Sequence, residues 1–446
     1  MLAMASDVAE FGSTFFKGND SLISESAKNE MMTCWNCGSD DYMDGNGLGW
    51  DYVEKQHYEQ SGIKVLGKGG DIGSTHAFLM VAPDENVSVS VLSAGGGSHL
   101  NEIMSEALLD VVLAERGKTV DKTGPDITLA GSLDNKYRKY EGYYSMRRAS
   151  ESMDIVRICF NENAMHTEVV GTGNNAAETY RPTADGGFVK VDENGNITAE
   201  REVLYFEELG GKVYTKIRSM TVLPGLGESE SKSYNGERMT EHSVSDQVLS
   251  AWTERADRPL VLYGDKYSST GYDAPFMKLS VPDQPEGYVI GSIYFGSAGM
   301  SIGRTFRIKD ENNMVFFQSI PSSSSRDLFD VSVSSESLSD GTRIQSFNAS
   351  NGWKYRFADE LPEFTASVSE VKLSSDEAQW YRISEDMGGG SITAERPEHS
   401  VICVYNQFRE LIYTTHVRNP ADEIPLPRGG YILFHGETGD SVQVFR

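Results

Sequence analysis

The sequence predicts an α+β unit followed by two or three mainly antiparallel β domains, each a β-barrel or a β-sandwich. Sustained apolar periodicity of the helical kind occurs before residue 118, with strand-like segments between the helical ones. From about residue 132, short β-branched and aromatic segments alternate with Asn-Gly, Asp-Gly and Gly-Gly turns, a pattern typical of barrels and sandwiches. A chain of 446 residues is long enough to bury several such cores.

Residues 1–118 are expected to form helices packed on an antiparallel sheet. Ser6 can cap a first helix, whose inward face would hold Val8, Phe11, Phe15 and Phe16. Ser24 can cap a second helix, with Ala27 and Met31 inward. Segments 77–81 and 87–91 flank a turn at 83–86 and predict a hairpin. Residues 99–116 predict a long amphipathic helix on the sheet, with a buried stripe of Leu100, Ile103, Met104, Ala107, Leu108, Val111 and Val112.

The rest of the chain is expected to be almost entirely β. Residues 119–131 contain Gly124 and Pro125 and are interpreted as a linker. We expect a β-barrel at 132–252, a second β domain at 253–362 and a small β domain at 363–446, with a helical segment at 244–256 between the first two.

Charge and hydropathy exclude some classes of function. The formal net charge of -26 repels nucleic acid and anionic membranes. No run of about 18 apolar residues predicts a membrane span. Residues 1–7 have neither a positive region nor a long apolar stretch, so no signal peptide is predicted. An extracellular or cell-surface location would therefore need an upstream segment to supply the signal.

Neither a metal nor a cofactor is expected. Cys34 and Cys37 have the spacing of redox and zinc motifs, but no second pair accompanies them. A local disulfide and two unreactive thiols both remain open for this pair. The eight histidines show no paired spacing. The glycines at 95–97 lack the lysine of a phosphate-binding loop, and residues 192–196 fit a hairpin turn better than a calcium loop.

A lysine among glycines is the strongest candidate for a functional site. Lys68 is followed by Gly69 and Gly70, and Gly73 lies three residues further on. Glycines at a sheet edge let a substrate approach the backbone, an ammonium can hold a carboxylate, and backbone N–H groups can face an oxyanion. Glycine-flanked lysines are also common in turns, so the motif alone leaves a structural role open. His76 in the next strand could likewise have a functional role near a pocket or a purely structural one.

The order of segments resembles the C-terminal part of the serine beta-lactamase superfamily. The residues that resemble it are Ala-Ser-Asp-Val-Ala-Glu-Phe at 5–11, Gly-Leu-Gly-Trp at 47–50, Lys-Gly-Gly at 68–70, Phe-Leu-Met-Val-Ala-Pro-Asp at 78–84 and the closing helix. The most similar branch contains class C beta-lactamases, D-alanyl-D-alanine carboxypeptidases, D-aminopeptidases and related esterases. The resemblance implies that residues 1–118 are the C-terminal part of a beta-lactamase-like catalytic domain.

The resemblance also implies roles for single residues. The family has the motifs Ser-x-x-Lys, Tyr-x-Asn and Lys-Thr-Gly, and Lys68-Gly69-Gly70 matches the third. Lys68 would face the substrate and the Asp71 N–H would donate to the oxyanion, while the substrate-binding residues would be Gly69, Gly70, Gly73 and His76. Gly69 stands where beta-lactamases have threonine, which puts beta-lactam specificity in doubt.

The first two motifs should precede Ser6, so we expect the C-terminal portion of a longer enzyme, such as a truncated gene would encode. Ser-x-x-Lys occurs at Ser61, Ser229 and Ser369, which are expected in a turn, an acidic loop and a β region, and therefore as coincidences. Lys122-Thr123-Gly124 lies in the linker and is interpreted in the same way.

The β tail offers weaker signals. Tyr137 and the tyrosine-rich segment 140–144 resemble the start of lipocalin-like barrels that follow the catalytic domain in several of these hydrolases and cover or shape the mouth of the site. Ordinary strand roles for these tyrosines remain open. The aromatics Trp353, Trp380 and Tyr381 could bind glycan or peptide, although core packing is the alternative.

Two hypotheses of function follow. In the first, the chain is part of a bacterial, penicillin-binding-protein-like serine hydrolase that acts on a peptide, ester or cell-wall-derived substrate and is inactive alone. Its N-terminal unit would expose apolar faces and pair with the missing half or with another protomer. In the second, the chain is a non-catalytic cell-surface or cell-wall binding protein that uses its β domains.

Overall fold

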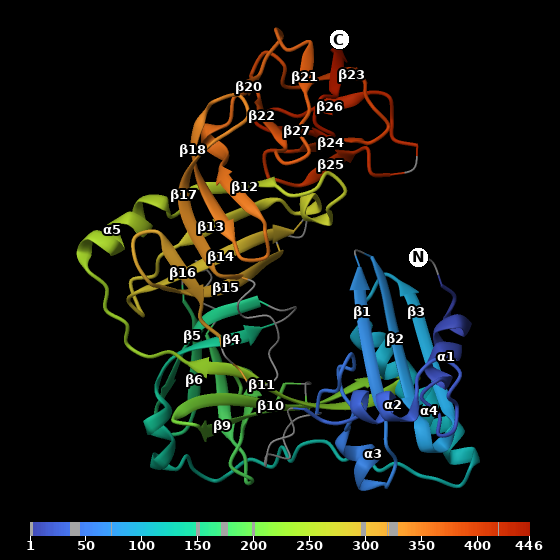
Figure 1. Ribbon diagram of the computed structural model, residues 1–446. Coiled ribbons are helices and arrows are strands. Elements are labelled where there is room, and N and C mark those ends of the chain that lie inside the picture. Colours follow the sequence, from blue (N-terminus) through green and yellow to red (C-terminus); the bar gives the residue numbers. More distant parts are fainter. Residues whose placement is uncertain are drawn as a thin grey trace.

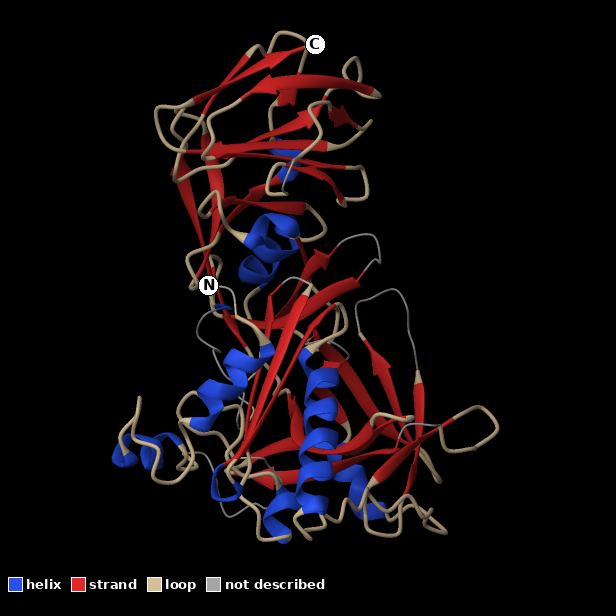
Figure 2. Ribbon diagram, turned by 90° about the vertical axis from the view of Figure 1, so that its right-hand side faces the viewer, coloured by secondary structure: helices blue, strands red, loops and turns tan. Residues whose placement is uncertain are grey.

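The computed structural model describes residues 3–35, 45–72, 74–148, 152–170, 177–198, 201–295, 300–318, 320, 329–417 and 419–446. An N-terminal unit with helices, two closed eight-stranded barrels and a pair of C-terminal sheets follow one another along the chain (Figure 1). Figure 2 shows that most of the helix lies beside one sheet, while the rest of the chain is mainly strand. The protein is therefore mostly β and antiparallel, as the sequence predicts.

The N-terminal unit places helices on both faces of a three-stranded antiparallel sheet of order β1-β2-β3. Its elements are α1 (Ala5–Ser13), α2 (Glu25–Met31), α3 (Gln56–Gln60), β1 (Leu66–Ile72), β2 (Thr75–Ala82), β3 (Val87–Ala94) and α4 (Ser98–Glu115). Successive side chains of β2 point to opposite faces. Leu79 packs with Phe15 beside α1, whereas Phe78 packs with Leu109 of α4.

The first helix differs from the prediction in its cap and its inward face. The helix is capped at Met4 and not at Ser6, because the Asp7 carboxylate accepts a hydrogen bond of 2.8 Å from the Met4 N–H. Since the helix ends at Ser13, Phe15 is buried beyond its end, and Phe11 is 47% exposed.

The second helix begins after Ser24, as predicted, but buries a lysine. Ala27 is exposed, and Lys28 is completely buried. The Lys28 ammonium donates to the carbonyl oxygens of Phe16 and Asn19, each at 3.1 Å, and pairs with Glu25. These partners compensate the buried positive charge of Lys28. The pattern of apolar residues in the sequence gives no sign that this lysine is buried.

Helix α4 matches the predicted bounds to within one residue at each end but has a different buried stripe. Ile103 is buried as expected, whereas Leu100, Leu108 and Val111 are exposed. Leu109 is buried against the sheet in their place. The stripe is rotated because α4 also contacts strand β11 of the first barrel, which covers a second side of the helix.

The first barrel closes from eight strands in the order β10-β11-β4-β5-β6-β7-β8-β9. Its strands are β4 (Gly142–Arg148), β5 (Ser152–Phe160), β6 (Met165–Val169), β7 (Glu178–Pro182), β8 (Phe188–Val191), β9 (Arg201–Leu209), β10 (Lys212–Leu223) and β11 (Gly227–Arg238). Tyr144 lies in β4 and is buried in its core, which confirms an ordinary strand role for this residue. Tyr137 and Tyr140 pack against the same core from a short 3-10 helix (Asn135–Tyr140), so the strand interpretation is wrong for these two. The long hairpin β10–β11 reaches the N-terminal unit (Figure 1).

Helix α5 (Asp246–Arg255) separates the two barrels, as the helical pattern predicts. The second barrel consists of β12 (Pro259–Gly264), β13 (Phe276–Ser280), β14 (Tyr288–Phe295), β15 (Met300–Ile308), β16 (Asn313–Phe316), β17 (Val331–Ser337), β18 (Arg343–Ala349) and β19 (Lys354–Phe357). Strands β12 and β19 pair and close it. Trp252 of α5 is fully buried, and its indole N–H donates to the Asp310 carbonyl at 2.8 Å.

The last part of the chain forms two sheets around one apolar core. The five-stranded sheet contains β20 (Glu363–Phe364), β22 (Gln379–Ile383), β27 (Tyr431–Gly436), β24 (Ser400–Tyr405) and β25 (Leu411–Thr414). The four-stranded sheet contains β21 (Glu370–Lys372), β28 (Ser441–Phe445), β23 (Gly390–Glu395) and β26 (Ile424–Leu426). Trp380 is 3% exposed, and Trp353 and Tyr381 pack against apolar cores, which confirms core packing for these aromatics.

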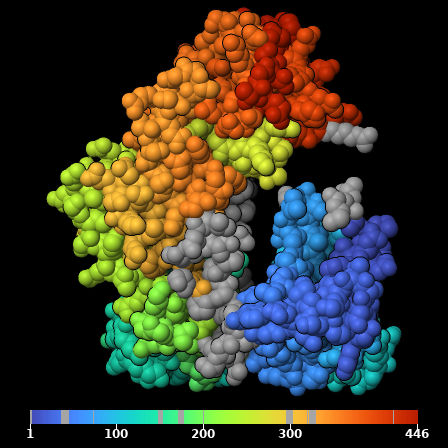
Figure 3. Space-filling view, viewed as in Figure 1, coloured from blue at the N-terminus to red at the C-terminus, as the bar shows by residue number. Residues whose placement is uncertain are grey.

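The expected domain boundaries at 118, 131, 252 and 362 stay predictions. In Figure 3 the N-terminal unit touches the first barrel at its base, and open space separates it from the C-terminal sheets. Among the described residues, no helix has the length and apolar character needed to cross a membrane.

Candidate functional site at the edge of strand β1

Strand β1 forms one edge of the sheet, and the segment 51–53 runs beside its first half. The Gly67 N–H donates to the Tyr52 carbonyl at 3.0 Å, and the Asp51 N–H donates to the Gly67 carbonyl at 2.9 Å. A Cβ at Gly67 would lie 2.1 Å from the Tyr52 ring, so only glycine permits this approach. Alternate residues of a strand present their N–H groups to the same side. The N–H groups of Gly69 and Asp71 therefore face this edge as well.

Asp51 occupies the edge beside the predicted lysine. Its Oδ1 lies 2.8 Å from the Lys68 ammonium, and its Oδ2 accepts a hydrogen bond of 2.7 Å from the Gly69 N–H. Both charged side chains are 48% exposed. An exposed ion pair contributes at most about 1 kcal/mol, so another carboxylate can compete with Asp51 for these two donors.

The Asp71 side chain joins β1 to the start of helix α4. Its carboxylate accepts hydrogen bonds from the Ser98 N–H at 2.9 Å and from the Ser98 hydroxyl at 2.7 Å, and it lies 2.5 Å from Nδ1 of His76. Burial favours a higher pKa for Asp71, but the hydrogen bonds from Ser98 and His76 outweigh it and lower the pKa. The carboxylate thus occupies the place near the helix N-terminus where an external anion would bind.

The structure divides the predicted site between the two faces of the sheet. Asp71 pairs with His76 in the β1–β2 register, so their side chains lie on the same face of the sheet. Lys68 pairs with Leu79, and its side chain leaves the strand on the opposite face. His76 is 8% exposed and in contact with Asp71, which supports the structural interpretation of this histidine. Gly73 lies outside the described residues.

A pocket of about 370 Å³ lies on the α4 side of this edge. Its lining includes Gly69, Gly70 and Asp71 of β1, Ser98 of α4 and Ser231 of the barrel strand β11. The first barrel therefore supplies one wall of a pocket in the N-terminal unit. That the barrel shapes the mouth of an active site stays a prediction.

A buried ionic network lies below the pocket, and the sequence analysis missed it. The Glu106 side chain is fully buried, and its Oε1 lies 2.7 Å from the Lys55 ammonium and 2.6 Å from the Ser229 hydroxyl. Lys55 also pairs with Glu102 at 2.5 Å. The network thus links α4, the segment before α3 and the barrel strand β11. The sequence signal is the spacing of Glu102, Glu106 and Asp110, which places three acids on one face of a helix.

Lys122 completes this network. Its ammonium lies 3.0 Å from Glu106 and 2.7 Å from Asp110, and it donates to the Glu228 carbonyl at 2.9 Å. Lys122-Thr123-Gly124 is therefore a structural anchor between α4 and the barrel. The sequence does not indicate this structural role, because Glu106 and Glu228 are distant from Lys122 in the chain.

The three Ser-x-x-Lys matches are not arranged as a catalytic pair. The Ser61 hydroxyl donates to the His57 carbonyl at 2.9 Å, while Lys64 donates to the Met32 carbonyl at 3.0 Å. Ser229 was expected in an acidic loop but lies buried in β11, because the hairpin continues as strand up to α4. Ser369 precedes β21 in the C-terminal sheets. None of the three begins a helix, as a lysine one turn later would require.

Two further predictions concern the cysteines and metals. Cys34 is disulfide-bonded, which favours the disulfide over unreactive thiols, and Cys37 lies outside the described residues. Cys159 and Cys403 are free. Within the described part of the chain, no group of three or more His, Cys, Asp or Glu could hold a metal ion.

Comparisons with known proteins give only distant likenesses. No protein-family model and no curated protein matches the chain. Similar solved structures include SurE, with 13% identity and a TM-score of 0.33 over 53% of this chain and 48% of that chain. SurE with D-Leu gives 13% identity and a TM-score of 0.32, over 53% of this chain and 50% of that one.

A third structure is the octameric penicillin-binding protein homologue from Pyrococcus abyssi, with 15% identity, a TM-score of 0.24, and 52% of this chain and 46% of that chain covered. The chain thus spans about half the length of these structures. Likenesses of this degree do not establish a family or an activity.

Proposed function

We propose that the edge of β1 is the substrate-binding strand of a serine-hydrolase-type site, with a nucleophile from outside the described residues. An extended acyl substrate would lie along Gly69–Asp71, its carboxylate would bind Lys68, and its carbonyl oxygen would accept from the Asp71 N–H. The chemistry would be acyl transfer to a serine hydroxyl followed by hydrolysis of the ester.

The observation that supports the proposal most is the position of Asp51. The Asp51 carboxylate contacts the Lys68 ammonium at 2.8 Å and the Gly69 N–H at 2.7 Å. These are the two donors that a substrate carboxylate would need. We infer that Asp51 holds this position until a substrate carboxylate replaces it. The substrate would be a small peptide, ester or cell-wall fragment, and its identity is left to experiment.

The binding test uses the intact chain and a pair of probes. N-acetyl-D-alanine carries the carboxylate, and its amide is the neutral control. Lys68→Met should weaken binding of the acid by about tenfold, since a charge-assisted hydrogen bond is lost. Lys278→Met is the matched control, because Lys278 also pairs with an aspartate, at 2.7 Å, but lies in the second barrel. Equal binding by the wild type and Lys68→Met would overturn the proposal.

The second test concerns the nucleophile. The purified chain should neither hydrolyse nitrocefin nor react with a fluorophosphonate probe. Turnover together with a labelled serine among the described residues would contradict an external nucleophile. Asp51→Asn tests the competition directly, and we expect it to bind N-acetyl-D-alanine more tightly than the wild type does.

A further inference from the structure

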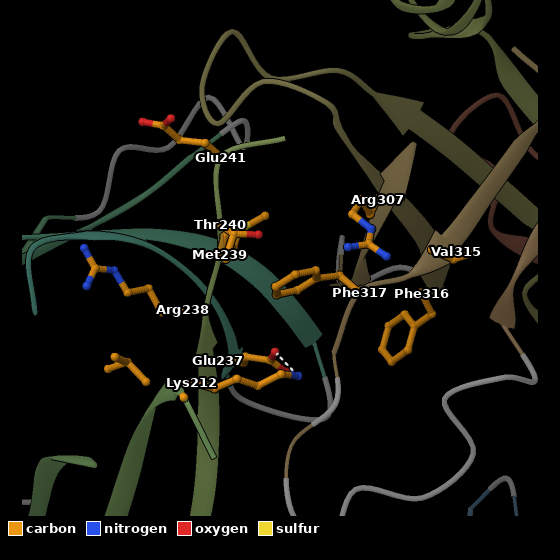
Figure 4. A pocket seen from close by; sticks show the side chains of 12 residues that line it. Lys212, Glu237, Arg238, Met239, Thr240, Glu241, Arg307, Val315, Phe316 and Phe317 are labelled. Atoms are coloured by element: carbon orange, nitrogen blue, oxygen red, sulfur yellow. Dashed lines mark hydrogen bonds and ion pairs between the residues drawn. The ribbon is translucent and has the colours of Figure 1, made fainter. Parts of the chain in front are cut away.

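A second and larger pocket lies between the two barrels, away from the edge of β1. Its volume is about 700 Å³, within the range of pockets that hold small organic ligands. The first barrel contributes the start of β10 and the end of β11, and the second contributes β15 and β16. Figure 4 shows the lining side chains, with Arg307 and Phe317 on the side of the second barrel.

The walls of this pocket are fixed by buried contacts between the barrels. The fully buried Gln318 donates from Nε2 to the Ser145 carbonyl at 3.0 Å, and Thr305 donates to the Met153 carbonyl at 2.9 Å. The Tyr288 hydroxyl donates to the Thr240 carbonyl at 2.8 Å. The pocket is therefore preformed, which lowers the entropic cost of binding.

The charges around the pocket favour an anion. Lys212 pairs with the buried Glu237 at 2.6 Å, as the dashed line in Figure 4 marks. Arg238 donates to the Lys139 and Glu141 carbonyls. The lining thus contains three cations and, with Glu241, two carboxylates, so it carries a net positive charge in a chain of net charge -26. A positive pocket in an acidic protein concentrates anions locally.

Arg307 is the cation available to a ligand. Within the described part of the chain, its guanidinium has neither an ion-pair partner nor a side-chain hydrogen bond, and the residue is exposed. Guanidinium groups bind carboxylates through two parallel hydrogen bonds. The apolar part of the lining lies beside it and consists of Val213, Met239, Val315, Phe316 and Phe317. Phe317 is only partly buried and packs edge-to-face on Tyr288.

From this combination we propose that the inter-barrel pocket binds a small aromatic carboxylate, with the carboxylate on Arg307 and the ring against Phe317. The proposal goes beyond the proposed function, since no residue of this pocket belongs to the edge of β1. The ligand class is defined by one negative charge joined to an apolar ring.

The test is a titration of the intact chain with N-acetyl-L-phenylalanine by calorimetry. The neutral amide of the same compound should bind at least tenfold more weakly, because it lacks the charge that pairs with Arg307. Arg307→Gln should weaken binding of the acid to the level of the amide. Phe317→Ala should weaken binding of the acid and of the amide equally, because it removes only an apolar contact that both make.

Two control variants separate this site from others. Arg343→Gln removes an exposed arginine of the same barrel outside the pocket and should bind the acid like the wild type. Lys68→Met should also bind the acid like the wild type, which distinguishes the pocket from the edge of β1. The proposal is overturned if the acid does not bind, if acid and amide bind equally, or if Arg307→Gln binds like the wild type.

Discussion

The Asp71 carboxylate, on strand β1, lies 2.9 Å from the backbone nitrogen of Ser98, the first residue of helix α4. Gly97, the residue before this helix, has no side chain to act as a cap, so Asp71 takes that role from a distant strand. We expect Asp71→Ala to destabilise the N-terminal unit by about 1 kcal/mol, the usual cost of losing a cap. Hydrogen exchange of the first α4 amides measures this directly. Asp84→Ala is the control, and equal exchange in both variants would refute the capping role.

Removal of Glu106 should cost more than removal of any surface charge. Glu106→Gln leaves the ammonium groups of Lys55 and Lys122 buried with reduced compensation. Breaking a buried pair in this way costs roughly 3 kcal/mol, which urea denaturation of the intact chain can measure. The double variant Lys55→Met with Glu106→Leu removes one cation and one anion together. The double variant should therefore lose less free energy of unfolding than the sum of the losses in the two single variants. A loss equal to that sum would contradict the network.

The same network should make stability depend on acid pH. Burial favours a higher pKa for Glu106 and Glu102, but Lys55 and its neighbours outweigh burial and lower both pKa values below the ordinary 4.5. The stabilisation is therefore present above about pH 4.5 and is lost as the pH falls toward the folded-state pKa values, because the unfolded chain then binds more protons. Denaturation midpoints between neutral and acid pH test this, and Glu106→Gln should flatten the dependence. An equally steep loss in that variant would rule out Glu106 as its source.

The sequence predicts the fold well where local patterns decide it. Turn residues and alternating strands identify the antiparallel tail, and the apolar period identifies α4 to within a residue. The buried face of α4 is predicted less well, because a second surface covers the helix. Leu108 and Val111 are exposed while Glu106 is buried, since strand β11 brings Ser229 to that side.

The candidate site shows the same limit. The motif at Lys68 and Gly69 lies at a sheet edge, as expected for a strand that borders a site. Neither Asp51 nor Ser231 could be assigned to it, because both arrive from other segments of the chain. Lys68 and Asp71 lie on opposite faces because successive strand residues alternate between faces, and their spacing of three residues in the sequence already implies this.

The outer edge of β3 is the feature most open to association. In the described part of the chain no strand pairs with it, and Leu108 and Val111 on α4 are 51% and 59% exposed. An unpaired strand and exposed apolar residues in the same unit both favour association with another polypeptide. We expect the chain to self-associate at high concentration, and more so in high salt, because salt screens the repulsion between copies of charge -26.

Sedimentation of the variant Leu108→Glu with Val111→Glu should show less association. Phe408→Glu, which changes a 72% exposed residue of the C-terminal sheets, is the control. A wild-type chain that stays monomeric at every salt concentration would contradict this role of the edge.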